Sequence, residues 1–87
     1  MNFVTAAQDY LDYILVTRSN GTYRYQLSKV NSLVAYFEKY DLEDVEKKKI
    51  ISFIGFLKKR NPKISETTIN KYISTLKRIY RYNLEKD

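Results

Sequence analysis

The sequence predicts a single all-α domain, a compact four-helix bundle that spans residues 1–87. The chain contains one proline and two glycines, which leaves little material for the turns that a β-sandwich needs. Hydrophobic residues make up 44% of the sequence, enough for one modest core. In four stretches they recur at spacings of three and four, the pattern of a helix with one buried face. Connections of a few residues between these stretches favour an antiparallel-style bundle.

The first helix is expected over residues 2–17, where apolar side chains form one stripe. The stripe consists of Phe3, Ala7, Tyr10, Leu11, Ile14 and Leu15. The polar segment Ser19-Asn20-Gly21-Thr22 then suits a turn, with Thr22 as the N-cap of the next helix.

The second helix, expected over residues 22–40, has the clearest periodicity in the chain. Its apolar positions step by four, three, four and three residues: Tyr23, Leu27, Val30, Val34 and Phe37. This stripe predicts a long helix with one side toward the core.

The third and fourth helices are expected over residues 45–60 and 66–83. Asp41-Leu42-Glu43-Asp44 places acids where the third helix presents its positive N-terminal end. Asn61-Pro62 is a break, because the residue before a proline is pushed out of the helical conformation, and Ser65 suits the start of the fourth helix. The inward stripes are Ile50, Phe53, Ile54 and Leu57 in the third helix and Ile69, Ile73, Leu76 and Tyr80 in the fourth.

Composition disfavours several classes of protein. Without cysteine, the chain uses neither disulfides nor thiolate metal sites. The longest largely apolar run, residues 50–57, is far shorter than the ~20 residues that cross a bilayer, and the N-terminus lacks the features of a signal peptide. We therefore expect a cytoplasmic protein with no membrane association and no cofactor. Histidine is absent, and no metal-ligand cluster, glycine-rich phosphate loop or nucleophile–base pair can be assembled, which argues against an independent enzyme.

The net charge of +6 is unevenly distributed. Residues 1–46 hold four Lys/Arg against seven Asp/Glu, and residues 47–87 hold twelve against three. The basic C-terminal half favours a polyanionic partner such as nucleic acid. Charge alone also fits a solvated lysine-rich surface, so the placement of the cations decides between the two interpretations.

In the fourth helix the cations gather on the face opposite the apolar stripe. With Ile69 at the centre of the buried side, a turn of about 100° per residue places an acid-free set outward. This set consists of Thr67, Lys71, Ser74, Arg78 and Arg81, with Asn70 at its edge. Long cations neutralise phosphates, and short hydroxyl and amide side chains reach base edges in a major groove. This face is therefore a candidate DNA-binding surface.

The second helix presents another candidate surface at its N-terminal half. Arg24, Tyr25 and Ser28 lie outside its apolar stripe, and Lys29 lies at the margin. The first two turns contain no acid, and the positive end of the helix dipole also favours phosphate there. For Tyr25 the alternative is a half-buried packing role.

Two further patterns have structural alternatives. Lys47-Lys48-Lys49 and Lys58-Lys59-Arg60 bracket the third helix and are candidates for contact with the DNA backbone, although lysines at helix ends are usually solvated. The nine tyrosines invite a nucleophile hypothesis. Tyr10, Tyr23 and Tyr80 fall on or beside apolar stripes, however, and core packing explains them better.

The order and spacing of these elements resemble the core-binding domain of tyrosine recombinases, the SAM-like N-terminal domain of phage-type integrases. The matching segments are Ser19-Asn20-Gly21-Thr22-Tyr23 with Leu27 and Phe37 for the S-x-x-T opening of the second helix, Leu42 and Ile50-x-x-Phe53-Ile54-x-x-Leu57 for the third, and Ser65-x-x-Thr68-Ile69-x-x-x-Ile73-x-x-Leu76 with Ile79-Tyr80 for the fourth. The resemblance spans nearly the whole chain.

The resemblance implies binding to duplex DNA at a recombination core site. In that family the second and fourth helices pack across the major groove and form one half of a clamp around the duplex. The contact positions that carry over are Arg24, Tyr25, Ser28, Thr67, Lys71 and Ser74. The family's catalytic domain, with its arginine constellation, H-x-x-R box and nucleophilic tyrosine, has no counterpart in a chain without histidine.

We therefore interpret the chain as a fragment of a longer recombinase. Its expected partners are double-stranded DNA, the C-terminal catalytic domain of the same parent chain and other recombinase protomers on DNA. The alternative function is a small helical protein–protein interaction module. Exposed apolar residues such as Leu33, Ile51 or Phe56 would then form a patch, and a surface without such a patch would count against it.

Overall fold

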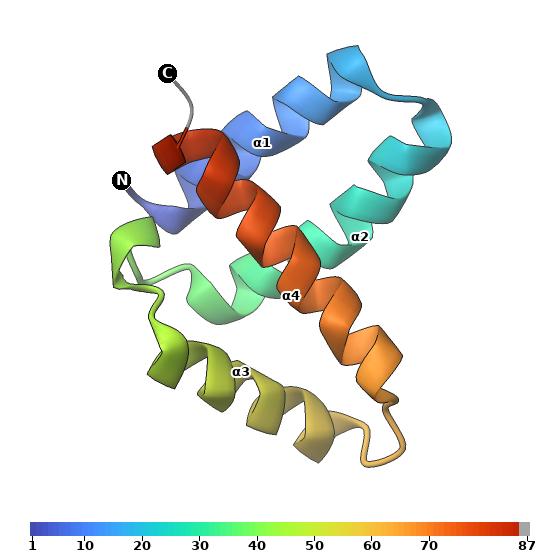
Figure 1. Ribbon diagram of the computed structural model, residues 1–87, viewed down its shortest axis with the longest axis vertical. Helices are drawn as coiled ribbons and strands as arrows, with labels where there is room; N and C mark the ends of the chain where they lie inside the picture. Colours follow the sequence, from blue (N-terminus) through green and yellow to red (C-terminus); the bar gives the residue numbers. More distant parts are fainter. Residues whose placement is uncertain (86–87) are drawn as a thin grey trace.

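The computed structural model describes residues 1–85, which form helices connected by short turns (Figure 1). The helices are α1 (Phe3–Thr17), α2 (Asn20–Phe37), α3 (Lys47–Arg60) and α4 (Glu66–Tyr80). A 3₁₀ turn, η1 (Leu42–Asp44), precedes α3, and a π-helical turn, η2 (Arg81–Glu85), continues α4. The described residues contain no β-strand, only an isolated bridge between Asn2 and Asp41. The predicted all-α class is confirmed.

The start of α2 differs from the sequence-based prediction. The sequence predicts Thr22 as the N-cap, but α2 begins at Asn20 and Ser19 is the cap. The segment predicted to be a turn is instead the first turn of the helix, because Ser19 Oγ accepts a hydrogen bond from Thr22 N over 3.3 Å. α4 starts as predicted, with Ser65 Oγ accepting from Thr68 N over 3.1 Å. Both helices open with a Ser-x-x-Thr cap.

α2 ends at Phe37, before the predicted end at Tyr40. The chain leaves the helix because the following segment pairs with the N-terminus. Phe3 N donates to Tyr40 O over 3.0 Å, and one step further Leu42 N donates to Met1 O over 2.7 Å. These backbone bonds replace the ones that further turns of α2 would have made.

The acids after α2 do not cap α3 as the sequence predicts. They form η1, and α3 begins at Lys47 rather than at residue 45, with no side-chain cap bond from Glu46. Glu43 instead pairs with the Met1 ammonium over 2.8 Å. This hydrogen bond lowers the pKa of the Glu43 carboxyl and raises the pKa of the amino terminus.

The fourth helix is predicted to reach residue 83, but regular α-helix ends at Tyr80 and η2 follows it. Asn83 Nδ2 donates to Ile79 O and to Ala6 O, both over 2.9 Å. The second of these bonds fastens η2 to α1. The last described turn therefore lies beside the first turn of α1, as Figure 1 also shows.

α4 lies across the hairpin that α1 and α2 form, and α3 lies along one side of the molecule (Figure 1). Apolar side chains from these helices and η1 make one core: Phe3, Ala6, Ala7, Tyr10, Leu11, Ile14, Val30, Leu33, Phe37, Leu42, Phe53, Leu57, Ile69, Leu76 and Ile79. Phe53 joins α3 to this core, because its ring centroid lies 5.4 Å from that of Phe37 and 5.9 Å from that of Tyr72. Burial of a phenylalanine side chain contributes about 1.5–3 kcal/mol.

Three apolar positions differ from the predicted stripes. Leu15 is 51% exposed, because α1 turns the side that carries Ala6 toward η2. Tyr80 is exposed and its neighbour Ile79 is buried in its place. Leu33, predicted to lie in an exposed patch, is fully buried. α2 is covered by both α1 and α4, so its buried side is wider than one stripe.

One buried polar side chain links three helices. Gln26 of α2 is 3% exposed, and its Oε1 accepts hydrogen bonds from the Tyr10 hydroxyl of α1 over 3.2 Å and from the Thr75 hydroxyl of α4 over 3.1 Å. A buried polar group left unpaired costs about 1–3 kcal/mol. These bonds therefore favour one alignment of α2 against α4.

Candidate nucleic-acid interface

The outward face of α4 carries the polar side chains that the sequence predicts there. Its exposed residues include Thr67, Asn70, Lys71, Ser74, Lys77 and Arg78. The buried residues opposite are Ile69, Thr75, Leu76 and Ile79. This buried set places Ser74 near the middle of the exposed face and brings Lys77 onto it. The sequence projection omits Lys77 because it takes Ile69 as the centre of the buried side, whereas the true centre is shifted toward Thr75 and Ile79.

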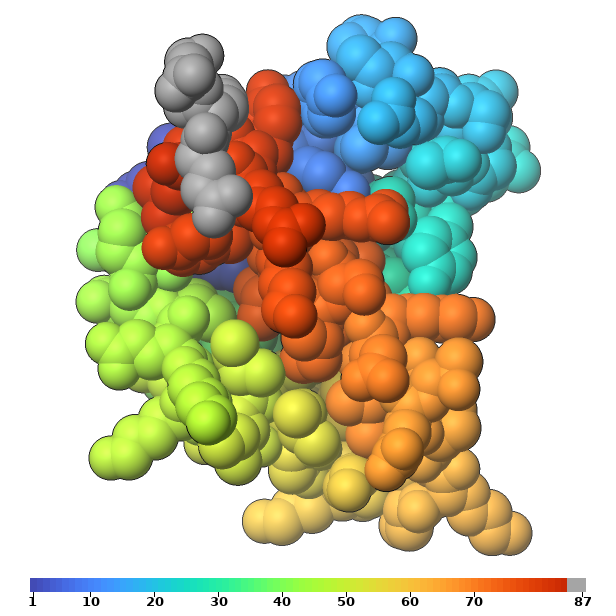
Figure 2. All heavy atoms as spheres, in the orientation of Figure 1, coloured from blue at the N-terminus to red at the C-terminus, as the bar shows by residue number. Residues whose placement is uncertain are grey.

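A groove of about 350 Å³ lies between α2 and α4. It is lined by Tyr25 and Gln26 from α2 and by Thr67, Asn70, Lys71, Ser74, Thr75 and Arg78 from α4. We call this the α2–α4 groove. In the space-filling view α4, coloured orange to red, forms the front surface, and α2, cyan to teal, lies beside it (Figure 2). The groove combines long cations, short hydroxyl and amide side chains and one aromatic ring.

The floor of the α2–α4 groove is held by the buried hydrogen bond between Gln26 and Thr75. Sequence reasoning missed this pair. The sequence does place two polar residues, Gln26 and Thr75, on helix faces that otherwise carry apolar side chains. The sequence does not give the relative position of α2 and α4, so it does not show that these two residues form a hydrogen bond with each other.

Tyr25 lines the groove from the α2 side, and Lys29 lies beside Tyr25 but outside the groove lining. The Tyr25 side chain is 42% exposed, so it is not a core residue. Lys29 is half-buried, and its Nζ lies 5.5 Å from the ring centroid of Tyr25 and 4.5 Å from that of Tyr72 on α4. These cation–π contacts hold the Lys29 charge between the two helices.

The remaining predicted positions lie outside the α2–α4 groove. Arg24 and Ser28 are exposed on α2 but do not line it. Arg81 belongs to η2 and lines two other hollows. The structure thus brings Tyr25 together with most of the predicted α4 face, and it leaves Arg24, Ser28, Lys29 and Arg81 outside that cluster.

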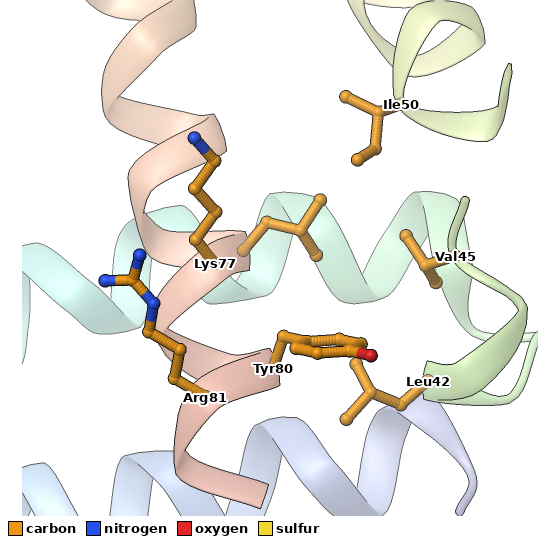
Figure 3. Close-up of a pocket in the computed structure, with 7 residues that line it drawn as sticks. Leu42, Val45, Ile50, Lys77, Tyr80 and Arg81 are labelled. Atoms are coloured by element: carbon orange, nitrogen blue, oxygen red, sulfur yellow. The ribbon is translucent and has the colours of Figure 1, made fainter. Parts of the chain in front are cut away.

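One of the hollows lined by Arg81 lies between α4 and the segment around η1 (Figure 3). Lys77 and Arg81 extend from one side of α4, and the Tyr80 ring points from the other side toward Leu42 (Figure 3). The floor of this hollow is mostly apolar, with Leu42, Val45, Ile50 and Leu76 in its lining. Its cations stand at the edge of the outward face of α4.

The charged side chains that line the α2–α4 groove are all positive. Within the part of the chain that the structure describes, no Asp or Glu lines the groove. The ion pair found among the described residues joins Met1 to Glu43, and no described carboxylate pairs with Lys71 or Arg78. Arg78 lies close to the Tyr10 hydroxyl: burial raises the pKa of this hydroxyl, and the charge of Arg78 acts in the opposite direction.

The lysine-rich runs of α3 lie away from the groove lining. Two of their cations pack on aromatic rings: Lys49 Nζ is 4.3 Å from the Tyr40 centroid, and Arg60 Cζ is 5.4 Å from the Phe56 centroid. Lys47, Lys48, Lys58 and Lys59 are exposed. The residues that the structure describes contain no group of three or more His, Cys, Asp or Glu placed to hold a metal ion, and no helix among them is long and apolar enough to span a membrane.

This small all-α domain has a cationic groove between two helices, and no described acid lines that groove. It therefore belongs to the class of helical domains whose surface suits a polyanion. A family model described as the phage integrase N-terminal SAM-like domain matches residues 7–87, and the chain belongs to this family. The resemblance to the N-terminal domain of integrases is thereby confirmed. No curated protein and no solved structure matches the chain.

Family membership places the chain in DNA recombination by phage-type integrases. The family is the N-terminal domain of these proteins, and this domain lacks the catalytic site. The chain accordingly has no histidine for an H-x-x-R box.

Proposed function

We propose that this domain binds duplex DNA at a recombination core site through the α2–α4 groove and the outward face of α4. In this proposal it forms the N-terminal half of a clamp and supports site-specific integration or recombination by a separate catalytic domain of the same parent chain. The observation that carries the proposal is the groove itself, where Lys71, Arg78 and short polar side chains gather and no acid of the described residues is present.

The size of α4 and the placement of its side chains suit a DNA duplex. An α4 of 15 residues is about 22 Å long, and a B-DNA major groove, about 12 Å wide, admits one helix. Ser74 stands near the middle of the exposed face, so the short side chains reach base edges while Lys71 and Arg78 reach phosphates to the sides. An asparagine such as Asn70 pairs well with the N6 and N7 edge of adenine.

Few phosphates are neutralised by one half of a clamp, so binding by the domain alone is expected to be weak and sensitive to salt. Each phosphate contact adds about 0.9 to the slope of log affinity against log salt concentration. Other recombinase protomers and the catalytic domain would supply the remaining contacts on the same duplex.

Fluorescence anisotropy with a labelled duplex, at several salt concentrations between about 50 and 200 mM, tests this proposal. The double variant Lys71→Glu/Arg78→Glu is expected to weaken binding roughly tenfold or more and to flatten the salt dependence. The matched control, Lys48→Glu/Lys59→Glu on α3, reverses the same charge on exposed residues outside the groove. Circular dichroism verifies that both variants keep their helices.

Two results would overturn the proposal. Affinity of the wild-type domain that does not fall as salt rises would remove its electrostatic basis. Equal losses of affinity in the α4 variant and the α3 control would show that DNA binding depends on the net charge of the domain and not on this face.

A further inference from the structure

A second hollow, of about 570 Å³, lies next to the α2–α4 groove, where the hairpin of α1 and α2 meets the end of α4. It is lined by Tyr10, Tyr13, Ile14, Arg18, Thr22, Arg78, Arg81 and Tyr82. Three of these residues are arginines from different segments: Arg18 follows α1, Arg78 belongs to α4 and Arg81 belongs to η2. We call this the arginine hollow.

The three arginines are exposed, and among the described residues no carboxylate lines the hollow with them. Asp12 on α1 does not line the hollow and forms no ion pair among the described residues, and its Oδ1 accepts a hydrogen bond from Gln8 Nε2 over 2.9 Å. Arg18 Nη1 makes one long hydrogen bond, of 3.4 Å, to the adjacent Thr17 carbonyl. A guanidinium has five N–H donors, so most of the donors of Arg18 remain available to a ligand.

The Tyr10 hydroxyl at the edge of the hollow is already used, since it donates to Gln26. Around it the described lining residues offer guanidinium donors and the Thr22 hydroxyl, and none of them is an anionic acceptor. An arginine guanidinium can donate two parallel hydrogen bonds to the oxygens of a phosphate. Phosphate is therefore the ligand that these lining residues are best suited to bind.

Arg78 lines both the arginine hollow and the α2–α4 groove. The two sites are therefore continuous, and a nucleic-acid strand that passes over one passes over the other. Continuity of this kind favours a backbone phosphate over a free anion or an acidic side chain of a protein.

We propose that the arginine hollow holds a backbone phosphate of duplex DNA, so that the DNA-binding surface extends from α4 over the end of α1. This inference rests on the proposed function and adds to it a contact by α1, through Arg18. Because it is a contact with phosphate, it contributes affinity at every sequence and no discrimination between bases.

The test measures duplex binding across a salt series for Arg18→Gln, Arg81→Gln and the control Lys39→Gln, each of which removes one positive charge from an exposed residue. Each arginine variant is expected to lower the salt slope by about 0.9 on two duplexes of unrelated sequence, and the lysine control is expected to keep the wild-type slope. Arg18→Lys keeps the charge but loses the fork, so it should retain the slope and lose part of the affinity.

Arginine variants with the slope of the lysine control would overturn the inference, and so would a loss on only one of the two duplexes. Lys71→Glu is measured in parallel to separate the two proposals. If Lys71→Glu abolishes binding while the arginine variants match the control, the arginine hollow alone is rejected. If Lys71→Glu is also without effect, the proposed function is rejected as well. Arg18 and Arg81 lie on different segments. If the variant at one of these positions fails to fold, the variant at the other still tests the inference.

Discussion

Thr75 on α4 donates its hydroxyl hydrogen to Gln26 on α2 over 3.1 Å, beneath the groove that we assign to DNA. The same oxygen of Gln26 accepts from Tyr10 on α1. These bonds position the helix that carries the cations against the helix that carries Tyr25. The geometry of the α2–α4 groove therefore depends on a polar contact in the core.

Removing the shared acceptor should destabilise the domain more than removing either donor. Gln26→Met leaves two buried hydroxyls without an acceptor and is expected to cost about 2–4 kcal/mol, whereas Thr75→Val removes one donor and is expected to cost about 0.5–1.5 kcal/mol. Urea unfolding of both variants and of the double variant measures these costs. The double variant should cost less than the sum of the two, and simple additivity would contradict the shared bond.

Stability should also decline in alkaline solution through Tyr10. Burial raises the pKa of its hydroxyl above 10.0, the value in the unfolded chain, so the folded protein keeps a proton that the unfolded chain releases. This contribution to stability is complete below about pH 10 and is lost as the pH rises toward the folded-state pKa. Tyr10→Phe removes the titrating group, so its unfolding free energy should fall less steeply above pH 10 than that of the wild type. Parallel curves for the two proteins would refute the assignment.

The caps of α2 and α4 give a third prediction. Ser19→Ala and Ser65→Ala each remove an oxygen that accepts a backbone N–H at the start of a helix, and each should cost about 1 kcal/mol of unfolding free energy. Ser52→Ala is the matched control, because the Ser52 hydroxyl donates to the Lys48 carbonyl within α3 and caps nothing. Thermal unfolding followed by circular dichroism compares them. A cap variant with the same melting temperature as the Ser52→Ala control would argue against the cap geometry.

Side chains that read bases should differ from those that hold phosphates. Asn70→Ala and Ser74→Ala are expected to reduce discrimination between sites by about 1–3 kcal/mol per lost base contact while leaving the salt slope unchanged. Selection of bound duplexes from a randomised library by the wild type and by each variant measures this. A variant that selects the same sites as the wild type would exclude the residue from base recognition.

The sequence predicts the outward face of α4 well, because that face follows from local periodicity and contains few interruptions. The Ser65 cap is predicted from the break at Asn61-Pro62 and the serine that follows it. The predicted cap at Thr22 is wrong, because Ser19 Oγ accepts a hydrogen bond from Thr22 N and starts the helix earlier. The short polar residues and the glycine of this segment suit a turn as well as a Ser-x-x-Thr cap. Local patterns identify a helix more reliably than they identify its first residue.

Features that depend on contact between distant segments were not predictable. The end of α2 is set by backbone bonds between Tyr40 and the N-terminus, and the burial of Leu33 is set by the second helix that covers α2. Arg18 lines the arginine hollow together with Arg81 because η2 packs on α1, where the Tyr82 ring centroid lies 4.8 Å from that of Tyr13. A helical projection treats each helix alone, so it finds the groove residues of α4 and misses both Arg18 and the pair that forms the groove floor.

Backbone amide chemical shifts of the isotope-labelled domain, recorded while duplex DNA is added, test the central claim most directly, and a chain of 10.4 kDa suits this measurement. The account predicts that the largest shift changes follow the α2–α4 groove, at residues 67–78 of α4 and residues 24–29 of α2, and that they diminish as salt is raised. Changes concentrated on α3, or a spectrum that duplex DNA leaves unaltered at low salt, would contradict it.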